Sequence, residues 1–145
     1  GESADARHGG EIDVVSWSWG MDSPSDAFGH ATARTSFDQL RIVKRVDSAT
    51  TALMSALRNN ELVKKAVLTV RKVDGEEALD YFIITIEKAR LTHHRVVGGE
   101  DAESYVLTEE LSLSFQKVSV EYVPQGKTGG GRETMTFETE INVKD

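Results

Sequence analysis

The sequence predicts a mainly β protein with one α-helix, and three observations point to this fold class. From Lys64 onward, apolar and polar residues alternate over most of the chain, as in half-buried strands. The dipeptide Asp74-Gly75 separates two such runs and favours a tight hairpin turn. Only the stretch from Asp47 to Asn60 spaces its apolar residues with the period of a helix.

Length, composition and charge limit the class of protein. The 145 residues, 39 % of them hydrophobic, are ordinary for one globular domain spanning residues 1–145, and no run is apolar enough to cross a bilayer. The absence of cysteine excludes disulfides and thiolate zinc sites. A formal net charge of −7 opposes binding to nucleic acid. We therefore expect neither nucleic acid as a partner nor membrane insertion.

Residues 1–10 are polar and predict a loop, and the stretch EIDVVSWSWG at residues 11–20 then predicts the first strand. Its heavy apolar side chains share one face: Val15, Trp17 and Trp19. Burying two indoles removes a large apolar area from water, so we expect this face to point into the core. Ser16 and Ser18 would then face solvent on the other side.

A long loop and a helix follow. Met21 to Thr35 has no periodicity and predicts a loop of a length that is usually either disordered or engaged by a partner. Phe37 to Arg45 is typical of a strand, with Leu40, Ile42 and Val43 as its apolar residues. The helix should start near Asp47 or Ser48, which can accept hydrogen bonds from free N–H groups, and stop at Asn59-Asn60. Its apolar stripe comprises Ala49, Ala52, Leu53, Ala56 and Leu57.

The remaining chain predicts strands. Ala66 to Val73 and Ala78 to Thr92 form the hairpin around Asp74-Gly75, and residues 98–104 form a polar loop. Within Tyr105 to Val123 the apolar phase switches, which predicts a bulge or sharp bend near Gln116-Lys117 and a passage from one sheet to another. A loop at residues 124–131 and a half-solvated strand at 133–143 close the fold. The expected core comprises Val15, Trp17, Trp19, Phe82, Ile84, Phe115 and Phe137.

Signals for catalysis or for a cofactor are absent. His93 and His94 are adjacent and would point to opposite faces of a strand, while His8 and His30 lie in expected loops, so no metal site is predicted. The acidic pairs Glu109-Glu110 and Glu100-Asp101 are expected to be solvated. The three glycines at 129–131 lack the spacing of a phosphate-binding loop. We expect no enzyme, no cofactor and no catalytic residue.

Four stretches carry a family resemblance: GES at 1–3, EIDVVSWSWG at 11–20, YFIITIEKARLT at 81–92 and LTEELSLSFQKVSVEYVPQ at 107–125. They resemble the haemolysin-coregulated protein (Hcp) family, which forms the inner tube of the bacterial type VI secretion system. The resemblance implies two antiparallel sheets forming a flattened β-barrel with the helix packed outside. It also implies a strand before the GES motif; because the sequence begins at this motif, we expect the domain to lack that strand.

The same resemblance implies a structural role. Rings of six subunits would stack into a hollow tube that assembles in the cytoplasm, is secreted, works with sheath and spike proteins, and carries effector proteins in its lumen. Ser16 and Ser18 would line the channel and bind effectors. The long loop would join stacked rings through Met21, Asp22, Ser23, Asp26, Phe28, His30 and Arg34.

Two other classes of function stay open. A small antiparallel barrel could be a monomeric ligand-binding module with an internal apolar cavity. A hydrolase built on Ser16 or Ser18 is the enzyme alternative, although no nucleophile-elbow glycine pattern surrounds either serine.

Overall fold

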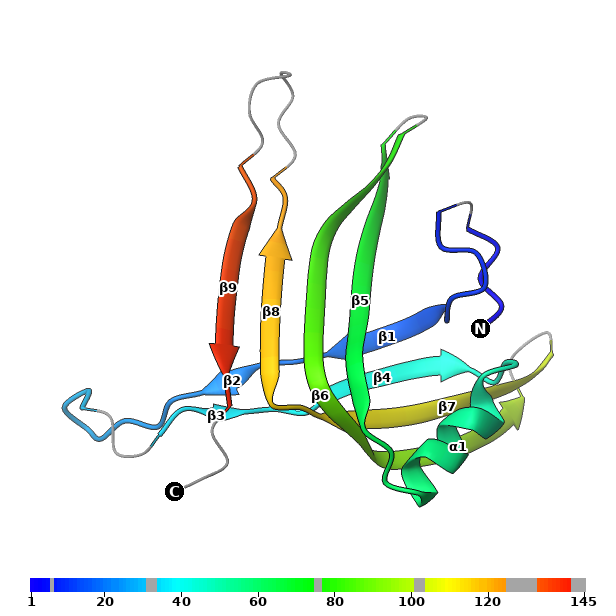
Figure 1. Cartoon of the computed structure of the whole chain (residues 1–145), viewed down its shortest axis with the longest axis horizontal. Helices are drawn as coiled ribbons and strands as arrows, with labels where there is room; N and C mark the ends of the chain where they lie inside the picture. The colour runs from blue at the N-terminus through cyan, green and yellow to red at the C-terminus, as the bar shows by residue number, and fades with distance from the viewer. Residues whose placement is uncertain (6, 31–33, 75–76, 101–103, 125–132, 142–145) are drawn as a thin grey trace. The chain divides into compact units, whose positions relative to one another are not determined.

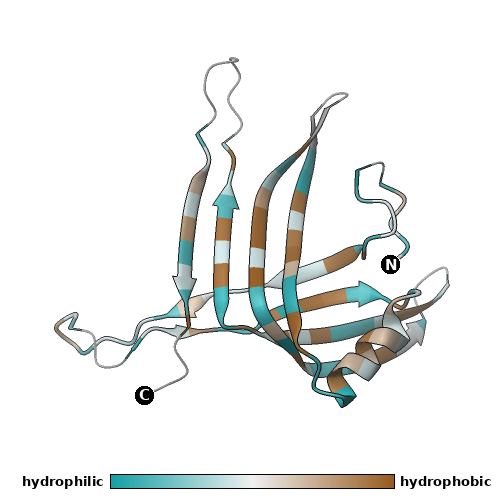
Figure 2. Ribbon diagram, viewed as in Figure 1, coloured by the Kyte–Doolittle hydropathy of each residue, from teal (hydrophilic) through white to brown (hydrophobic). Residues whose placement is uncertain are grey.

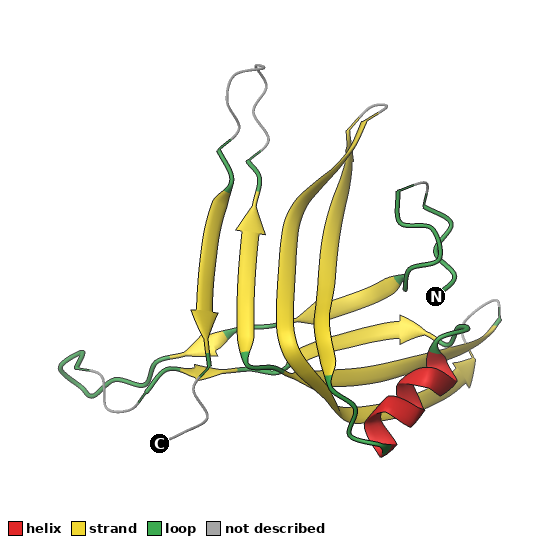
Figure 3. Ribbon diagram, in the orientation of Figure 1, coloured by secondary structure: helices red, strands yellow, loops and turns green. Residues whose placement is uncertain are grey.

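The computed structural model describes residues 1–5, 7–30, 34–74, 77–100, 104–124 and 133–141. Within them the chain is mainly β, with two antiparallel sheets that are not closed and one helix (Figures 1 and 3). The fold class expected from the sequence is confirmed. The chain divides into two compact units: unit 1 is Gly1–Glu61 with Arg90–Ser114, and unit 2 is Leu62–Ala89 with Phe115–Asp145.

Unit 1 contains a four-stranded antiparallel sheet, the helix α1 (Thr50–Arg58) and a two-stranded ribbon. The sheet runs in the order β1 (Val14–Ser18), β4 (Leu40–Arg45), β7 (Tyr105–Ser114) and the second half of β6 (Glu77–Glu100). One face is apolar, because the row Leu40, Leu113 and Leu91 lies across three strands and is buried. The row beside it, Arg41, Ser112 and His93, points to the opposite face.

Strand β1 is an edge strand of this sheet. The prediction that Val15, Trp17 and Trp19 all belong to the core was partly wrong. A bulge between Val14 and Ser16 shifts the register, so that Val14 and Trp17 share the apolar face while Val15 is 58 % exposed. Trp17 is still 36 % exposed, because an edge strand has no neighbour on one side. Trp19 is half-buried and donates a hydrogen bond from Nε1 to the Asp38 carbonyl at 2.9 Å.

The segment expected to be a loop from Met21 to Thr35 is not without regular structure, because its start pairs with the residues that follow it. Strands β2 (Met21–Asp22) and β3 (Ser36–Phe37) pair antiparallel, with Met21 opposite Phe37. The ribbon and the loop that it carries project from one end of unit 1 (Figure 1). Residues 31–33 of the expected loop lie outside the described residues.

The expected helix is confirmed, but it begins later than expected: α1 starts at Thr50, with Ala49 as its N-cap residue in place of Asp47 or Ser48. Asp47 Oδ1 accepts a hydrogen bond from the Ala49 N–H at 2.9 Å, so Asp47 orders the turn that leads into α1. At the other end Asn60 has a φ of 51°, the left-handed conformation that ends helices. The Glu61 N–H then donates to the Ala56 carbonyl at 2.9 Å.

Unit 2 is a four-stranded antiparallel sheet in the order β5 (Val63–Asp74), the first half of β6, β8 (Lys117–Tyr122) and β9 (Met135–Glu140). Hydrophobic residues alternate with polar ones along its strands (Figure 2). Its buried side chains are Leu68, Ile84, Ile86, Ala89, Phe115 and Val118. Phe82 is only half-buried. The core prediction was wrong for Phe137, which is 41 % exposed because β9 is an edge strand.

Strand β6 passes through both units and is longer than predicted. The expected hairpin is confirmed, with Asp74 opposite Glu77 and residues 75–76 outside the described part of the chain. The loop predicted from Gly98 begins later, because Gly98 still pairs with Leu107. Lys88 has a φ of 52°, an unusual backbone conformation for a residue with a side chain, next to the point where β6 leaves unit 2.

The phase switch in the Tyr105–Val123 run is confirmed as a strand break. Strand β7 ends at Ser114 in unit 1 and β8 begins at Lys117 in unit 2, so the chain does pass from one sheet to the other. Phe115 is buried at the break, and the Gln116 N–H donates to the Glu87 carbonyl at 3.1 Å.

Candidate functional site

The exposed face of the unit 1 sheet carries the two serines singled out from the sequence. Paired residues of antiparallel strands point to the same side of a sheet. The register therefore assigns to one side Ser16, Ser18, Arg41, Val43, Arg45, His93, Arg95, Thr108, Glu110 and Ser112. We call this set the open face. Helix α1 lies on the other side, where its first residue, Thr50, hydrogen-bonds to Glu109.

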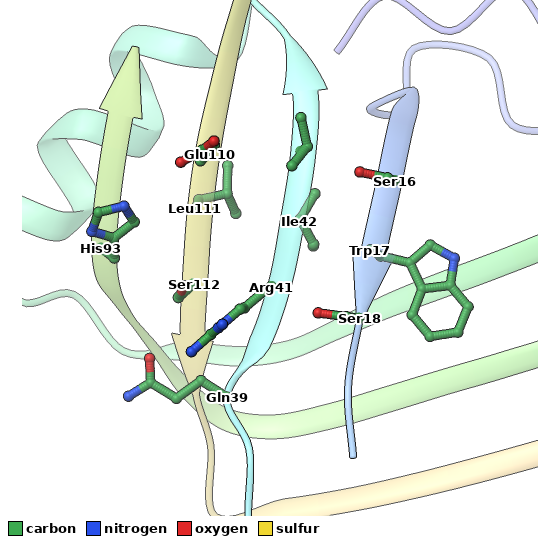
Figure 4. Close-up of a pocket in the computed structure, with 11 residues that line it drawn as sticks. Ser16, Trp17, Ser18, Gln39, Arg41, Ile42, His93, Glu110, Leu111 and Ser112 are labelled. Atoms are coloured by element: carbon green, nitrogen blue, oxygen red, sulfur yellow. The ribbon is translucent and has the colours of Figure 1, made fainter. Parts of the chain in front are cut away.

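The open face is hollowed into a depression of about 580 Å³. Ser16 and Ser18 point across it towards β4, whereas the Trp17 indole points away (Figure 4). Gln39 lies at its end and accepts a hydrogen bond from Thr92 Oγ1 at 2.5 Å. Both serines are exposed, and their role as a channel wall stays a prediction.

The charges of the open face are exposed and of mixed sign. Arg41, Arg45, Arg95 and Glu110 are all exposed. Among the described residues, none of these four side chains forms an ion pair or a hydrogen bond. Arg41 and Glu110 line the depression with the two serines and offer donors and one carboxylate to a partner that enters it. Arg45 and Arg95 lie on the same face of the sheet but do not line the depression.

The opposite side of the sheet holds a buried ionic cluster that the sequence analysis missed. Lys44 is 1 % exposed and Glu109 is 0 % exposed. Lys44 Nζ donates to Glu109 Oε1, and also to Asp47 Oδ1 at 2.9 Å. Thr50 Oγ1 donates to Glu109 Oε1 at 2.9 Å, and His94 Nε2 lies 2.7 Å from Glu109 Oε2. These contacts join β4, β6, β7 and the start of α1.

The cluster changes the ionisation of its carboxylates. Burial alone would raise the pKa of Glu109, but hydrogen bonds from Lys44, His94 and Thr50 outweigh it and lower that pKa below its ordinary value. The pKa of Asp47 is lowered in the same way, against burial, by Lys44 and by the Ala49 N–H. The expectation that Glu109 is solvated was therefore wrong. The signal was present in the alternation, since Glu109 shares a face with Leu111 and Leu113.

The tip of the long loop is an ordered turn. Asp26 Oδ1 accepts hydrogen bonds from the N–H groups of Phe28 and His30 at 2.8 and 2.9 Å, as in turns closed by an aspartate side chain. This turn leaves the Phe28 side chain 85 % exposed. Of the residues assigned to ring stacking, all lie exposed on this segment: Met21, Asp22, Ser23, Asp26, Phe28, His30 and Arg34.

No three His, Asp or Glu side chains in the described part of the chain are placed to hold a metal ion. No described helix has the length and hydropathy that crossing a membrane requires. Among the described residues, no histidine hydrogen-bonds to Ser16 or Ser18, so the hydrolase alternative gains no support.

Comparison with known proteins places these features in a family context. The family model described as "Type VI secretion system effector, Hcp" matches residues 1–122. Protein hcp1 of Pseudomonas aeruginosa is 36 % identical over 99 % of this chain and 91 % of its own length. The crystal structure of Hcp1 from Salmonella typhimurium is similar with a TM-score of 0.77 and 27 % identity, covering 97 % of this chain and 87 % of that chain. A type VI secretion system effector from Yersinia pestis gives a TM-score of 0.73 and 25 % identity, covering 97 % and 92 %.

Proposed function

Because this chain belongs to the Hcp family of type VI secretion system proteins, we propose that it is a subunit of the secretion tube. In this proposal six copies form a ring, rings stack into a hollow tube, and the tube is assembled in the cytoplasm and then secreted. Its partners are further copies of itself, effector proteins in the lumen, and the sheath and spike of the apparatus. The role is structural, with no catalytic step.

The observation that carries the proposal is the amount of apolar surface left open at the margins of a single chain. Trp17 on the edge strand β1, Met135 on the edge strand β9 and Phe28 at the loop tip are 36 %, 61 % and 85 % exposed. Exposed apolar side chains at sheet edges invite pairing with another chain. Heterologous contacts between copies give closed rings or stacked filaments, which is the assembly expected of a tube subunit.

We further propose that the long loop joins stacked rings. The expected result for Phe28→Ser is intact single rings whose stacking constant falls by about 10- to 100-fold per contact, because burying a phenylalanine contributes roughly 1.5–3 kcal/mol. Analytical ultracentrifugation and negative-stain microscopy measure the ring and stack populations.

Met54→Ser is the matched control, since Met54 is an exposed apolar residue on α1. If stacking is unchanged in Phe28→Ser, or is weakened equally in Met54→Ser, the long loop does not form the stacking contact. A wild-type protein that stays monomeric at high concentration would instead fit the ligand-binding module.

The second part of the proposal places Ser16 and Ser18 on the channel wall. They lie on the face opposite α1, which is the inner face of a ring that carries its helices outside. Small hydroxylated side chains keep such a wall wide and offer hydrogen bonds to many partners.

Ser18→Gln should leave rings intact and weaken retention of a co-expressed effector about fivefold or more, because added bulk at a fitted contact costs roughly 1–3 kcal/mol. Pull-down at matched ring concentration measures the retained effector. Ser55→Gln makes the same change on the exposed surface of α1 and should retain effector normally. Equal retention in all three proteins would place Ser18 away from the wall.

A further inference from the structure

The open face is basic although the protein is acidic. The whole chain has a formal net charge of −7. The open face has three arginines, Arg41, Arg45 and Arg95, and one carboxylate, Glu110, which gives +2 with His93 neutral. The charge of this face is therefore opposite in sign to that of the molecule.

The three arginines lie on the same face of the sheet, on strands β4 and β6, with only β7 between these strands. Arg41 and Arg45 lie on the same side of β4, four residues apart, and Arg95 lies on β6 across Glu110 of β7. Glu110 is directly opposite Arg95 in the register, yet in the described structure no ion pair joins them. The one carboxylate of this face therefore neutralises none of the three arginines by direct contact in the described structure. Here the guanidinium groups are left to solvent or to a partner.

The chemistry of the guanidinium group limits the kinds of ligand that the three arginines can recognise. A guanidinium presents a planar fork of donors that matches a carboxylate, and Arg is over-represented where carboxylates or phosphates are recognised. Between these two ligand classes, a polyphosphate carries charge along its whole length and is repelled beyond the patch by the net charge of −7 on the chain. A protein segment can instead carry a few carboxylates that meet the three arginines and be uncharged elsewhere.

We propose that the open face binds the carboxylates of an acidic protein segment through Arg41, Arg45 and Arg95. The serine hydroxyls at the edge of the depression accept and donate further hydrogen bonds to the same segment. If the chain is a tube subunit, this surface selects acidic cargo; only the selection of cargo, and not the binding of carboxylates, rests on the proposed function.

The test uses the purified full chain and a short fluorescein-labelled peptide that carries three glutamates separated by glycine and serine, followed by fluorescence anisotropy. The triple variant Arg41→Gln/Arg45→Gln/Arg95→Gln should bind the peptide about 3- to 100-fold more weakly, since exposed charge pairs contribute roughly 1.4- to 5-fold each. Glu110→Gln should bind it more tightly. Affinity should fall as salt is raised, because exposed charges are screened.

The matched control removes the same three charges elsewhere, as Arg58→Gln/Lys64→Gln/Lys65→Gln, all at exposed positions. Equal weakening in both triple variants would overturn the proposal, because only the net charge would matter. Tighter binding of single-stranded DNA than of the peptide, lost in the arginine variant, would also overturn it in favour of a phosphate-binding surface.

The outcomes separate this inference from the proposed function. Light scattering on the same samples reports ring formation, which the arginine variant should retain. Rings without peptide binding would overturn the arginine surface and leave the tube proposal standing. If the protein never forms rings but binds the peptide through the arginines, the tube proposal is overturned and the arginine surface stands.

Discussion

Glu109→Ala should lower the free energy of unfolding by about 3–5 kcal/mol, the usual cost of removing one partner of a buried ion pair. Glu109 is 0 % exposed and accepts hydrogen bonds from Lys44 and Thr50, with His94 at 2.7 Å. Without it, the partners that Lys44 keeps among the described residues are Asp47 and the Arg45 carbonyl, at a buried site. Because Asp47 remains, we expect a loss at the lower end of the range. Urea unfolding followed by circular dichroism measures it.

Two variants make this prediction specific to burial. Glu110→Ala removes the neighbouring carboxylate from the open face and should change stability by less than about 0.5 kcal/mol, as exposed substitutions do. Lys44→Met/Glu109→Leu should recover most of the loss, because an apolar pair leaves no buried charge. A similar loss in Glu109→Ala and Glu110→Ala would contradict the buried cluster.

The ionisation of the cluster sets the pH range of this effect. The pKa values of Glu109 and Asp47 are lowered in the folded protein, from ordinary values of 4.5 and 3.8. The stabilisation is therefore fully present above those ordinary values and is lost as pH falls through the lowered ones. The difference in stability between wild type and Glu109→Ala should be constant from neutral pH down to about pH 5 and shrink as the pH falls further.

Ile86→Ala should cost about 2–5 kcal/mol, and more than Trp17→Ala, despite the larger size of tryptophan. Ile86 is 0 % exposed in unit 2, opposite the equally buried Val118. Trp17 is 36 % exposed on an edge strand, so its loss removes less buried area, and we expect about 1–3 kcal/mol.

Thermal and urea unfolding of both variants under identical conditions give the comparison. Val67→Ala is the control, because Val67 is 52 % exposed on β5 and should cost little. If Trp17→Ala lowers the free energy of unfolding of the single subunit more than Ile86→Ala does, Trp17 is buried in the core and this prediction is wrong.

The sequence by itself determined the main strands, the helix and the existence of the strand break, which it placed near Gln116-Lys117 and the structure places at Phe115-Gln116. Periodicity is a local property: alternation specifies a strand and a stripe of alanines and leucines specifies α1, whatever lies around them. The family followed from the same residues. The solvent-facing side of Ser16 and Ser18 also follows from local alternation.

The tertiary structure alone decided which alternating residues are buried and which charges meet. Val15, Trp17 and Phe137 are exposed because a bulge and two sheet edges lie where the local pattern gives no sign of them. Lys44 and Glu109 stand 65 residues apart, and only the pairing of β4 with β7 brings them together under α1. Three arginines from two distant segments gather on the open face for the same reason, since strand register is a long-range property of the chain.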